Sequence, residues 1–322
     1  MNIVIATNKK YVPISYVMAF SLFENNHSDK IDMYVLHSEL DESDIGSLSD
    51  LAEKYGNHLI SVKVDRSIFP KKLPTTKLWS IETYYRLAIL QLLPKELDRI
   101  LYLDVDIIVM DDLGELYNTD FEDNHFIACD DADPGGKNFP DRQTLFKEPF
   151  EAGYRYFNAG VMLWNLSYLR ENYTMQDYLD LAKKLDYSMS TLDQDLLNLM
   201  HWGHIGYADQ RYNYYARLRS NDGDTVEDAK KAAIIHYLSQ KPWNADGYHF
   251  PIESIWWDYA KKTPYYMQLL EEFLDKTLTD QTIFLHSSSL FQDNKKLQDA
   301  LNQSVALNNK LYGMLTNAKQ DQ

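Results

Sequence analysis

Short apolar runs alternate with amphipathic segments along the first part of the chain. Residues 3–6, 31–37 and 59–64 are apolar runs that predict buried strands. Between them, VPISYVMAFSLFENN (12–26) has helical spacing of its apolar residues, and DESDIGSLSDLAEKYG (41–56) predicts a capped helix that ends at a glycine. Strand, helix, strand, helix, strand within about 65 residues is typical of a parallel sheet with crossover helices. In such sheets, ligands bind beyond the carboxyl ends of the strands.

The alternation continues through the middle of the chain. A helix is expected at residues 82–92, and it leads into the apolar run RILYLDVDIIVM (99–110). Further expected strands are 126–129, 161–164, 204–207 and 233–236, and further expected helices are 175–185 and 192–200. The pattern therefore predicts an α/β protein with a mostly parallel sheet flanked by helices.

The last 60 residues or so have a different character. From about Tyr265 the sequence is rich in Gln, Asn, Lys and Leu, and no proline follows Pro264. Two series recur every seven residues: Leu290, Leu297, Ser304 and Leu311, and Asn294, Leu301, Asn308 and Leu315. Such a partly polar heptad seam is compatible with a helix packed on its own domain or with self-association, in which a buried Asn would fix the register. We divide the chain into a main domain, 1–262, and a helical C-terminal extension, 263–322, as a candidate oligomerisation element.

Composition and charge narrow the classes of partner. The chain has 322 residues, a formal net charge of −16 and a single cysteine, Cys129. The negative charge argues against binding nucleic acid or anionic lipid through a diffuse basic surface, so an anionic ligand must be met by a few placed cations or a metal ion. One cysteine excludes an internal disulfide. Neither a signal-peptide pattern nor an apolar run of about 18 residues is present, and we expect no transmembrane segment and a cytoplasmic location.

Two carboxylates, Asp104 and Asp106, stand one residue apart in the run 99–110. In an extended segment, side chains at i and i+2 point to the same side, so the two converge if the strand continues through them. Two carboxylates at one point repel each other unless a cation or a proton lies between them. Oxygen ligands favour Mg²⁺ or Mn²⁺, whose open positions accept phosphate oxygens.

Other interpretations of this D-x-D pair remain open. An EF-hand loop fails, because Ile108 and Val109 occupy positions that such a loop fills with polar residues and glycine. A solvated loop after a strand fits the bare pair. A phosphatase of the haloacid dehalogenase type also fits, with Asp104 as nucleophile and Asp106 as general acid, although that motif usually lies on the first strand of the chain.

Three further motifs accompany the pair: RYFNAGVMLWNL (155–166), TLDQDLLN (191–198) and AAIIHYLSQKPWN (232–244). In their order and spacing, over about residues 1–262, these motifs resemble those of the family-eight glycosyltransferases. The resemblance implies the GT-A fold, which is a Rossmann-like, mixed and mostly parallel sheet flanked by helices. It also implies a retaining enzyme that uses a nucleotide sugar.

The resemblance assigns metal ligands and a phosphate-binding cation. Asp104, Asp106 and His236 would bind Mn²⁺ (or Mg²⁺), and a neutral imidazole at the end of a predicted strand suits that role. Lys241 would hold the β-phosphate of the donor as the local cation that an acidic protein needs. The family usually has a glycine where Ser239 stands, so the phosphate loop differs here.

Further residues match donor-binding and sugar-contacting positions of the family. The expected donor-binding residues are Ala6, Thr7, Asn8, Tyr11, Arg86, Asp104, Val105, Asp106, Ser239 and Lys241. The expected catalytic and sugar-contacting residues are Asp130, Asn158, Asp193 and Gln194. Gln194 would lie beneath the sugar, on the face opposite the leaving group, although the LDQD sequence would also serve simply as a helix start.

Together with the D-x-D pair, this resemblance implies a metal-dependent retaining glycosyltransferase. It would move a hexose (glucose, galactose or N-acetylglucosamine) from a UDP-sugar to a glycan acceptor on a glycoprotein or a cell-surface polymer. The acceptor hydroxyl would attack on the face from which UDP departs, and residues 132–153 would form a lid. The alternatives are the D-x-D phosphatase and a catalytically silent sugar-nucleotide-binding module.

Overall fold

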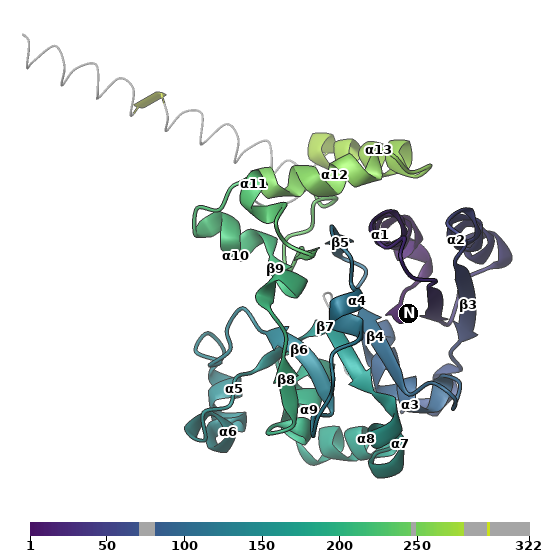
Figure 1. Ribbon diagram of the computed structural model, residues 1–322. Helices are drawn as coiled ribbons and strands as arrows, with labels where there is room; N and C mark the ends of the chain where they lie inside the picture. Colours follow the sequence, from purple (N-terminus) through teal and green to yellow (C-terminus); the bar gives the residue numbers. More distant parts are fainter. Residues whose placement is uncertain (71–80, 246–248, 280–294, 297–322) are drawn as a thin grey trace, which may run out of the picture. The chain divides into compact units, whose positions relative to one another are not determined.

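The computed structural model describes residues 1–70, 81–245, 249–279 and 295–296 (Figure 1). The chain divides into two compact units. The first comprises Met1–Pro242 and His249–Tyr266, and the second comprises Trp243–Tyr248 and Met267–Gln322. No helix in the described part of the chain is long and apolar enough to cross a membrane.

A seven-stranded sheet forms the centre of the first unit (Figure 1). Its order is β3 (His58–Lys63), β2 (Asp32–His37), β1 (Asn2–Ala6), β4 (Arg99–Leu103), β7 (Phe157–Asn165), β6 (Phe126–Asp130) and β8 (Ile205–Tyr207). Strands β1, β2, β3 and β4 are parallel, β8 is parallel to β6, and β7 is antiparallel to both β4 and β6. The expected mixed, mostly parallel sheet is therefore confirmed.

Helices lie on both faces of this sheet because its strands are apolar on both sides. In β4, Ile100 and Tyr102 pack in one core, whereas Leu101 and Leu103 pack in the other, as the two-residue period of a strand requires. Helices α1 (Val12–Asn25) and α2 (Glu42–Lys54) cover one face, and α7 (Leu166–Asn172), α8 (Met175–Lys184) and α9 (Leu192–His201) cover the other. The predicted helices in these regions are confirmed, apart from α7, which the sequence pattern missed.

Capping residues explain the ends of α2. The Asp41 side chain accepts hydrogen bonds from the backbone N–H groups of Ser43 and Asp44. In turn, the Asp44 side chain accepts a hydrogen bond from the Asp41 N–H, which completes a capping box. After the last turn, Gly56 has a φ of +74°, in the left-handed region that favours glycine.

The remaining elements are short, apart from the 14-residue helix α13. The α-helices are α3 (Ile89–Leu92), α4 (Gly114–Tyr117), α5 (Pro140–Leu145), α6 (Lys147–Glu151), α10 (Ala216–Asn221), α11 (Val226–Ala229), α12 (Ser254–Ala260) and α13 (Tyr266–Thr279). The 3₁₀ helices are η1 (Lys9–Tyr11), η2 (Arg66–Ile68), η3 (Ile81–Ala88), η4 (Gln210–Asn213) and η5 (Pro251–Glu253). The C-terminal helix is confirmed as far as Thr279, whereas the heptad positions lie outside the described residues.

The predicted helix at 82–92 is confirmed, and most of its length is a 3₁₀ helix. The 3₁₀ segment η3 is followed by only four α-helical residues. A 3₁₀ helix has three residues per turn, which aligns Thr83 with Arg86 on one face, and both line the same cavity.

The D-x-D segment is not part of one continuous strand, contrary to the condition set by the sequence argument. Strand β4 ends at Leu103, the chain turns through Asp104–Asp106, and β5 (Ile107–Val109) joins a second sheet of order β5, β10, β9. In this sheet, β10 (Ile234–His236) is antiparallel to β5 and parallel to β9 (Tyr214–Tyr215). Because His236 is paired with Ile107, the histidine lies beside the turn that carries the two carboxylates.

Candidate active site

Asp104, Asp106 and His236 converge on one point. One ligand atom from each residue lies within 4.8 Å of the ligand atoms of the other two. Among the described residues, these three form the cluster of acidic, His or Cys side chains that could hold a metal ion. His236 Nε2 lies 3.3 Å from Asp106 Oδ1 and 4.0 Å from Asp104 Oδ2. The two carboxylates come from the end of β4 and the turn after it, and the imidazole comes from the end of β10.

The surroundings of His236 fit a divalent cation. The imidazole is wholly buried, and its Nδ1 lies 2.8 Å from Asn213 Oδ1. Its Nε2 faces the two carboxylates and has no hydrogen-bond partner, which is costly for a buried polar atom unless a ligand completes the site. A Cβ on Gly160 would lie 2.3 Å from His236 Cε1 and 2.8 Å from Asp104 Oδ2, so only glycine permits this approach. Carboxylate oxygens with one imidazole suit Mn²⁺ or Mg²⁺.

Two cationic side chains hold the carboxylates. Lys241 Nζ contacts Asp106 Oδ2 and donates to Tyr237 O at 2.8 Å. Burial alone would raise the pKa of Asp106, but Lys241 and His236 hold it well below its usual value, so Asp106 is ionised at neutral pH.

Arg86 fixes the other carboxylate. Its guanidinium donates to Asp104 Oδ1 at 2.8 Å and to Ala159 O at 2.6 Å, and its Nε lies 2.8 Å from Asp193 Oδ2. Burial alone would lower the pKa of Arg86, but Asp104 and Asp193 raise it above its ordinary value. The guanidinium of Arg86 therefore binds protein groups and holds Asp104 in position.

A cavity of about 360 Å³ opens beside this cluster, beyond the carboxyl ends of β1 and β4, where the sequence predicts ligand binding. Its lining residues are Ala6, Thr7, Asn8, Lys10, Tyr11, Glu82, Thr83, Arg86, Tyr102, Asp104, Val105, Asp106 and Lys241. The structure thus gathers the predicted donor-binding residues, except Ser239, which does not line the cavity. Ser239 has a φ of +63°, in the left-handed region, which explains the family's usual glycine there. Tyr102, which the sequence argument missed, donates to Asp104 Oδ1 at 2.9 Å.

Asn158 and Gln194 contact each other. Gln194 Oε1 accepts from Ala159 N–H at 2.8 Å and from Asn158 Nδ2 at 3.2 Å. Gln194 Nε2 donates to Asp131 Oδ2 at 3.2 Å, and Asn158 Nδ2 lies 3.3 Å from the same oxygen. Because a backbone N–H can only donate, the amide of Gln194 has a defined orientation, and its oxygen is engaged.

Asp193 also lies in the first turn of α9. Thr191 precedes this helix as its N-cap residue, so Asp193 is not the cap. Burial raises the pKa of Asp193 to about 6, although Arg86 opposes this rise.

Asp130 and Asp131 have different surroundings. Asp130 Oδ1 lies 3.2 Å from Arg155 Nε, whereas it is Asp131 that contacts Asn158 and Gln194. The register between β6 and β7 shifts between Ala128 and Asp130, and Asp131, the residue after the shift, is the acid that contacts Asn158 and Gln194. The role of Asp130 as a sugar contact stays a prediction. In the sequence, the second Asp of FIACDD was the signal that could have identified Asp131.

Residues 132–153 contain α5 and α6 and one buried cation, Arg142. The Arg142 guanidinium stacks on the Tyr156 ring, with 3.8 Å to the centroid, and lies 3.5 Å from Asp131 and 3.6 Å from Asp195. The segment is thus anchored beside Asp131, and its role as a lid stays a prediction.

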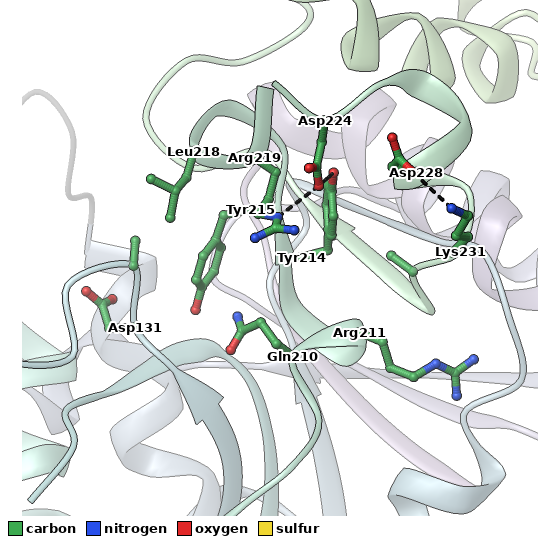
Figure 2. Close-up of a pocket in the computed structure, with 12 residues that line it drawn as sticks. Asp131, Gln210, Arg211, Tyr214, Tyr215, Leu218, Arg219, Asp224, Asp228 and Lys231 are labelled. Carbon is green, nitrogen blue, oxygen red and sulfur yellow. Dashed lines mark hydrogen bonds and ion pairs between the residues drawn. The ribbon is translucent and has the colours of Figure 1, made fainter. Parts of the chain in front are cut away.

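A second cavity, of about 480 Å³, is larger than the first and has Asp131 in its wall (Figure 2). Its other lining residues are Ala132, Gln210, Arg211, Tyr214, Tyr215, Leu218, Arg219, Asp224, Asp228, Lys231 and Ala232. The charged groups are paired, with Arg219 2.9 Å from Asp224 and Lys231 2.8 Å from Asp228. Tyrosine rings together with balanced charges suit an uncharged, hydroxyl-rich ligand such as a carbohydrate.

Comparisons with known proteins agree with this geometry. The family model described as glycosyl transferase family 8 matches residues 2–247. The chain is 32% identical over 247 residues to a lipopolysaccharide 1,2-glucosyltransferase of Escherichia coli, covering 70% of this chain and 67% of that protein. It is 26% identical over 270 residues to a lipopolysaccharide 1,3-galactosyltransferase of Salmonella typhimurium, covering 82% and 79%. A crystal structure of the galactosyltransferase LgtC with donor and acceptor sugar analogues is similar, with a TM-score of 0.70, 25% identity, and coverage of 82% of this chain and 96% of that one.

Proposed function

The chain belongs to glycosyl transferase family 8, and from this premise we propose that it transfers a hexose from a UDP-sugar to a glycan acceptor with the help of a divalent cation. Membership confirms the family resemblance, and the similarity to LgtC confirms the GT-A fold. Nothing in these comparisons supports the phosphatase. The observation that carries the proposal is the convergence of Asp104, Asp106 and the unpartnered Nε2 of His236 beside a cavity at the sheet edge.

Asp104, Asp106 and His236 would hold the cation, with Mn²⁺ as our first choice. When bound, the cation supplies positive charge that attracts the donor diphosphate and stabilises negative charge on the departing UDP. Lys241 lies in the same cavity and would turn its ammonium from Asp106 to the β-phosphate. The uridine would occupy the part of the cavity lined by Thr7, Asn8 and Tyr11, where the phenol ring offers a stacking face.

The sugar end of the donor would lie against Asn158, Asp193 and Gln194. Because Gln194 Oε1 already accepts two hydrogen bonds, we propose that Gln194 orients and stabilises the sugar rather than attacking it. The acceptor hydroxyl would form its bond to the anomeric carbon on the face from which UDP leaves. The bond to the UDP oxygen breaks, and the acceptor proton passes to the β-phosphate.

The acceptor would bind in the cavity of Figure 2, since Asp131 lies both in its wall and against Gln194. The named activities of the two relatives favour glucose or galactose as the hexose and a cell-surface glycan as the acceptor. We also propose a cytoplasmic location, consistent with a single buried, free cysteine, and self-association through residues 263–322.

A thermal-shift screen tests the donor and the cation together. UDP, GDP, ADP and UDP-hexoses are compared with and without Mn²⁺, and we expect a stabilising shift only when UDP or a UDP-hexose and Mn²⁺ are both present. Asp106→Ala should abolish this shift and the transfer activity, whereas Asp50→Ala, at an exposed site in α2, should change neither. A full shift with Asp106→Ala would refute the assignment of the pair.

A further inference from the structure

Three buried side chains form a hydrogen-bonded chain between the metal site and the side chains that contact Gln194. Asn158 on β7, Asn213 in η4 and His236 on β10 are each no more than 5% exposed. Asn213 Nδ2 lies 3.0 Å from Asn158 Oδ1, and Asn213 Oδ1 lies 2.8 Å from His236 Nδ1. Asn213, in the segment RYNYY, has no role in the sequence argument.

The backbone determines which way each amide in this hydrogen-bonded chain faces. Gly160 N–H lies 3.0 Å from one side-chain atom of Asn158, and because an N–H can only donate, that atom is the carbonyl oxygen. The Asn213 group that faces the same oxygen must then be its NH₂. The oxygen of Asn213 is consequently turned toward His236.

An acceptor beside Nδ1 selects one tautomer of a neutral imidazole. The proton must sit on Nδ1, and the lone pair is then on Nε2. Nε2 is the atom that faces Asp104 and Asp106 without a hydrogen-bond partner. In the other tautomer, an N–H would point at the cation position, and two lone pairs would face each other across 2.8 Å.

We propose that Asn213 is a positioning residue of the metal site, which keeps the proton of His236 on Nδ1 and leaves Nε2 for the cation. Asn158 sets the orientation of Asn213 through its oxygen and contacts Gln194 through its nitrogen, so one amide joins the metal end and the sugar end of the site. The inference rests on the proposed function for the role of the cation, but the contact of the Asn213 oxygen with a protonated Nδ1 is a property of the metal-free protein. Partners of this kind typically change metal affinity by about 10- to 100-fold.

Two variants of Asn213 distinguish the hydrogen bond to His236 from a general effect of packing. Asn213→Ala removes both hydrogen bonds, whereas Asn213→Asp keeps an acceptor beside His236, loses the donor to Asn158 and adds a negative charge. Asn26→Ala is the matched control, because Asn26 is also buried and bonds on both sides, to Leu22 O and Leu113 N, in another part of the fold. Thermal unfolding of each full-length variant verifies folding, and Asn213→Ser replaces the alanine variant if that one does not fold.

The first readout is ¹⁵N NMR of the histidine side chains in the metal-free, full-length protein, with the His236 signal assigned by its loss in His236→Gln. We expect a proton on Nδ1 in the wild type and in Asn213→Asp, and its loss or a tautomer mixture in Asn213→Ala. A proton on Nε2 with none on Nδ1 in the wild type would overturn the inference. The deciding observation is the Nδ1 proton, because in the metal-free protein Nε2 also faces the carboxylate of Asp106. This arm gives an answer even if the protein binds no Mn²⁺, an outcome that would count against the proposed function instead.

The second readout is Mn²⁺ affinity, measured by the EPR signal of free Mn²⁺ in the presence of UDP. We expect Asn213→Ala to bind Mn²⁺ about 10- to 100-fold more weakly, with Asn26→Ala close to the wild type and Asn213→Asp no weaker than the wild type. Equal Mn²⁺ affinity in Asn213→Ala and the wild type would overturn the inference. So would an equal loss in Asn213→Asp, because the acceptor would then not be the cause.

Discussion

Gly160 is the residue whose replacement gives the sharpest steric test of the metal site. Gly160→Ala would place a Cβ 2.3 Å from His236 Cε1 and 2.8 Å from Asp104 Oδ2, and the buried imidazole has little room to retreat. We expect Mn²⁺-dependent UDP binding to weaken by at least about 10- to 100-fold, as measured by calorimetry.

A glycine elsewhere provides the control for this substitution. A Cβ on Gly46 of α2 would meet no atom within 4 Å. Gly46→Ala should therefore leave UDP binding unchanged and stabilise the fold by about 0.5–1 kcal/mol, because alanine is the better residue inside a helix. Normal UDP binding in Gly160→Ala would contradict the assigned geometry.

Lys241 gives a second prediction, because its ammonium contacts Asp106 in the metal-free protein. Lys241→Met removes a positive charge from the cation site, so Mn²⁺ alone should bind more tightly, by roughly tenfold or about 1.4 kcal/mol. UDP should bind more weakly, since its β-phosphate loses a partner. EPR titration of Mn²⁺ and calorimetry of UDP measure the two effects, and Lys262→Met in the same unit is the control. A change of the same sign in both affinities would argue against the two roles of Lys241.

Single residues also mark the limits of reasoning from sequence. Asp104, Asp106 and His236 were identified from their motifs, and the structure brings them together. Asp131 was missed because the register shift in β6 is a property of strand pairing. Asn213 was missed because nothing in its segment suggests a contact with a histidine 23 positions later.

At the scale of elements, the D-x-D turn shows why Asp104 and Asp106 converge as predicted, although they do not lie in one continuous strand. The sequence argument required a continuous strand, but β4 ends at Leu103 and β5 belongs to another sheet. The carboxylates still converge, because the turn presents them to β10, whose pairing with β5 brings His236 alongside. Strands and helices with clear periodicity were predictable. The pairing of β5 with β10 was not, since it depends on contacts between segments far apart in the chain.

The junction between β6 and α9 makes stability depend on pH. His125, just before β6, and His201, the last residue of α9, are buried, and their Nδ1 atoms are 2.9 Å apart. Burial, with a smaller contribution from His204, lowers the pKa of His125 to about 4, and burial also lowers the pKa of His201. In the unfolded chain a histidine binds its proton near pH 6.5, so between about 6.5 and 4 the unfolded state holds more protons. The contribution of these two histidines to stability therefore falls as the pH falls through this window.

We expect His125 alone to cost roughly 2 kcal/mol of unfolding free energy between pH 7 and pH 5. Thermal unfolding at the two pH values measures this as a drop in Tm. His125→Phe should reduce the drop, because it removes one titrating group while keeping a flat ring beside Tyr168 and His204. Replacement of the exposed His27 by Gln should leave the drop unchanged. An identical drop in His125→Phe would locate the pH dependence elsewhere.

At the scale of the whole molecule, the seven-stranded sheet places the donor cavity. Its parallel strands β1 and β4 end at one edge, and the turn after β4 delivers the carboxylates there, as the rule for parallel sheets predicts. The reversed strand β7 brings Asn158 and Gly160 to the same edge, because it runs antiparallel to β4 and starts where β4 ends. The mostly parallel sheet was predictable from the βαβ pattern, whereas the reversal of β7 was not, since the linker between 129 and 161 carries no clear pattern.

Self-association through the C-terminal extension is the prediction for the whole chain. In the described part, α13 exposes Met267 (58%) and Leu274 (45%), which are seven residues apart and therefore share one face of the helix. The heptad series of residues 290–315 follows in sequence. Exposed apolar side chains at this spacing favour a partner helix, and a second copy of the chain supplies one.

Deleting residues 280–322 should lower the solution mass, measured by analytical ultracentrifugation, to that of a monomer. The chain up to Thr279 keeps the two cores of the sheet and every residue of the proposed donor site, so UDP binding with Mn²⁺ should persist. Replacing Leu297 and Leu301 by Ser in the full-length chain should reduce the mass in the same way, because each removes an apolar seam position. An unchanged mass in both variants would refute the heptad interpretation, and loss of UDP binding in the truncated chain would mean that the extension contributes to the donor site.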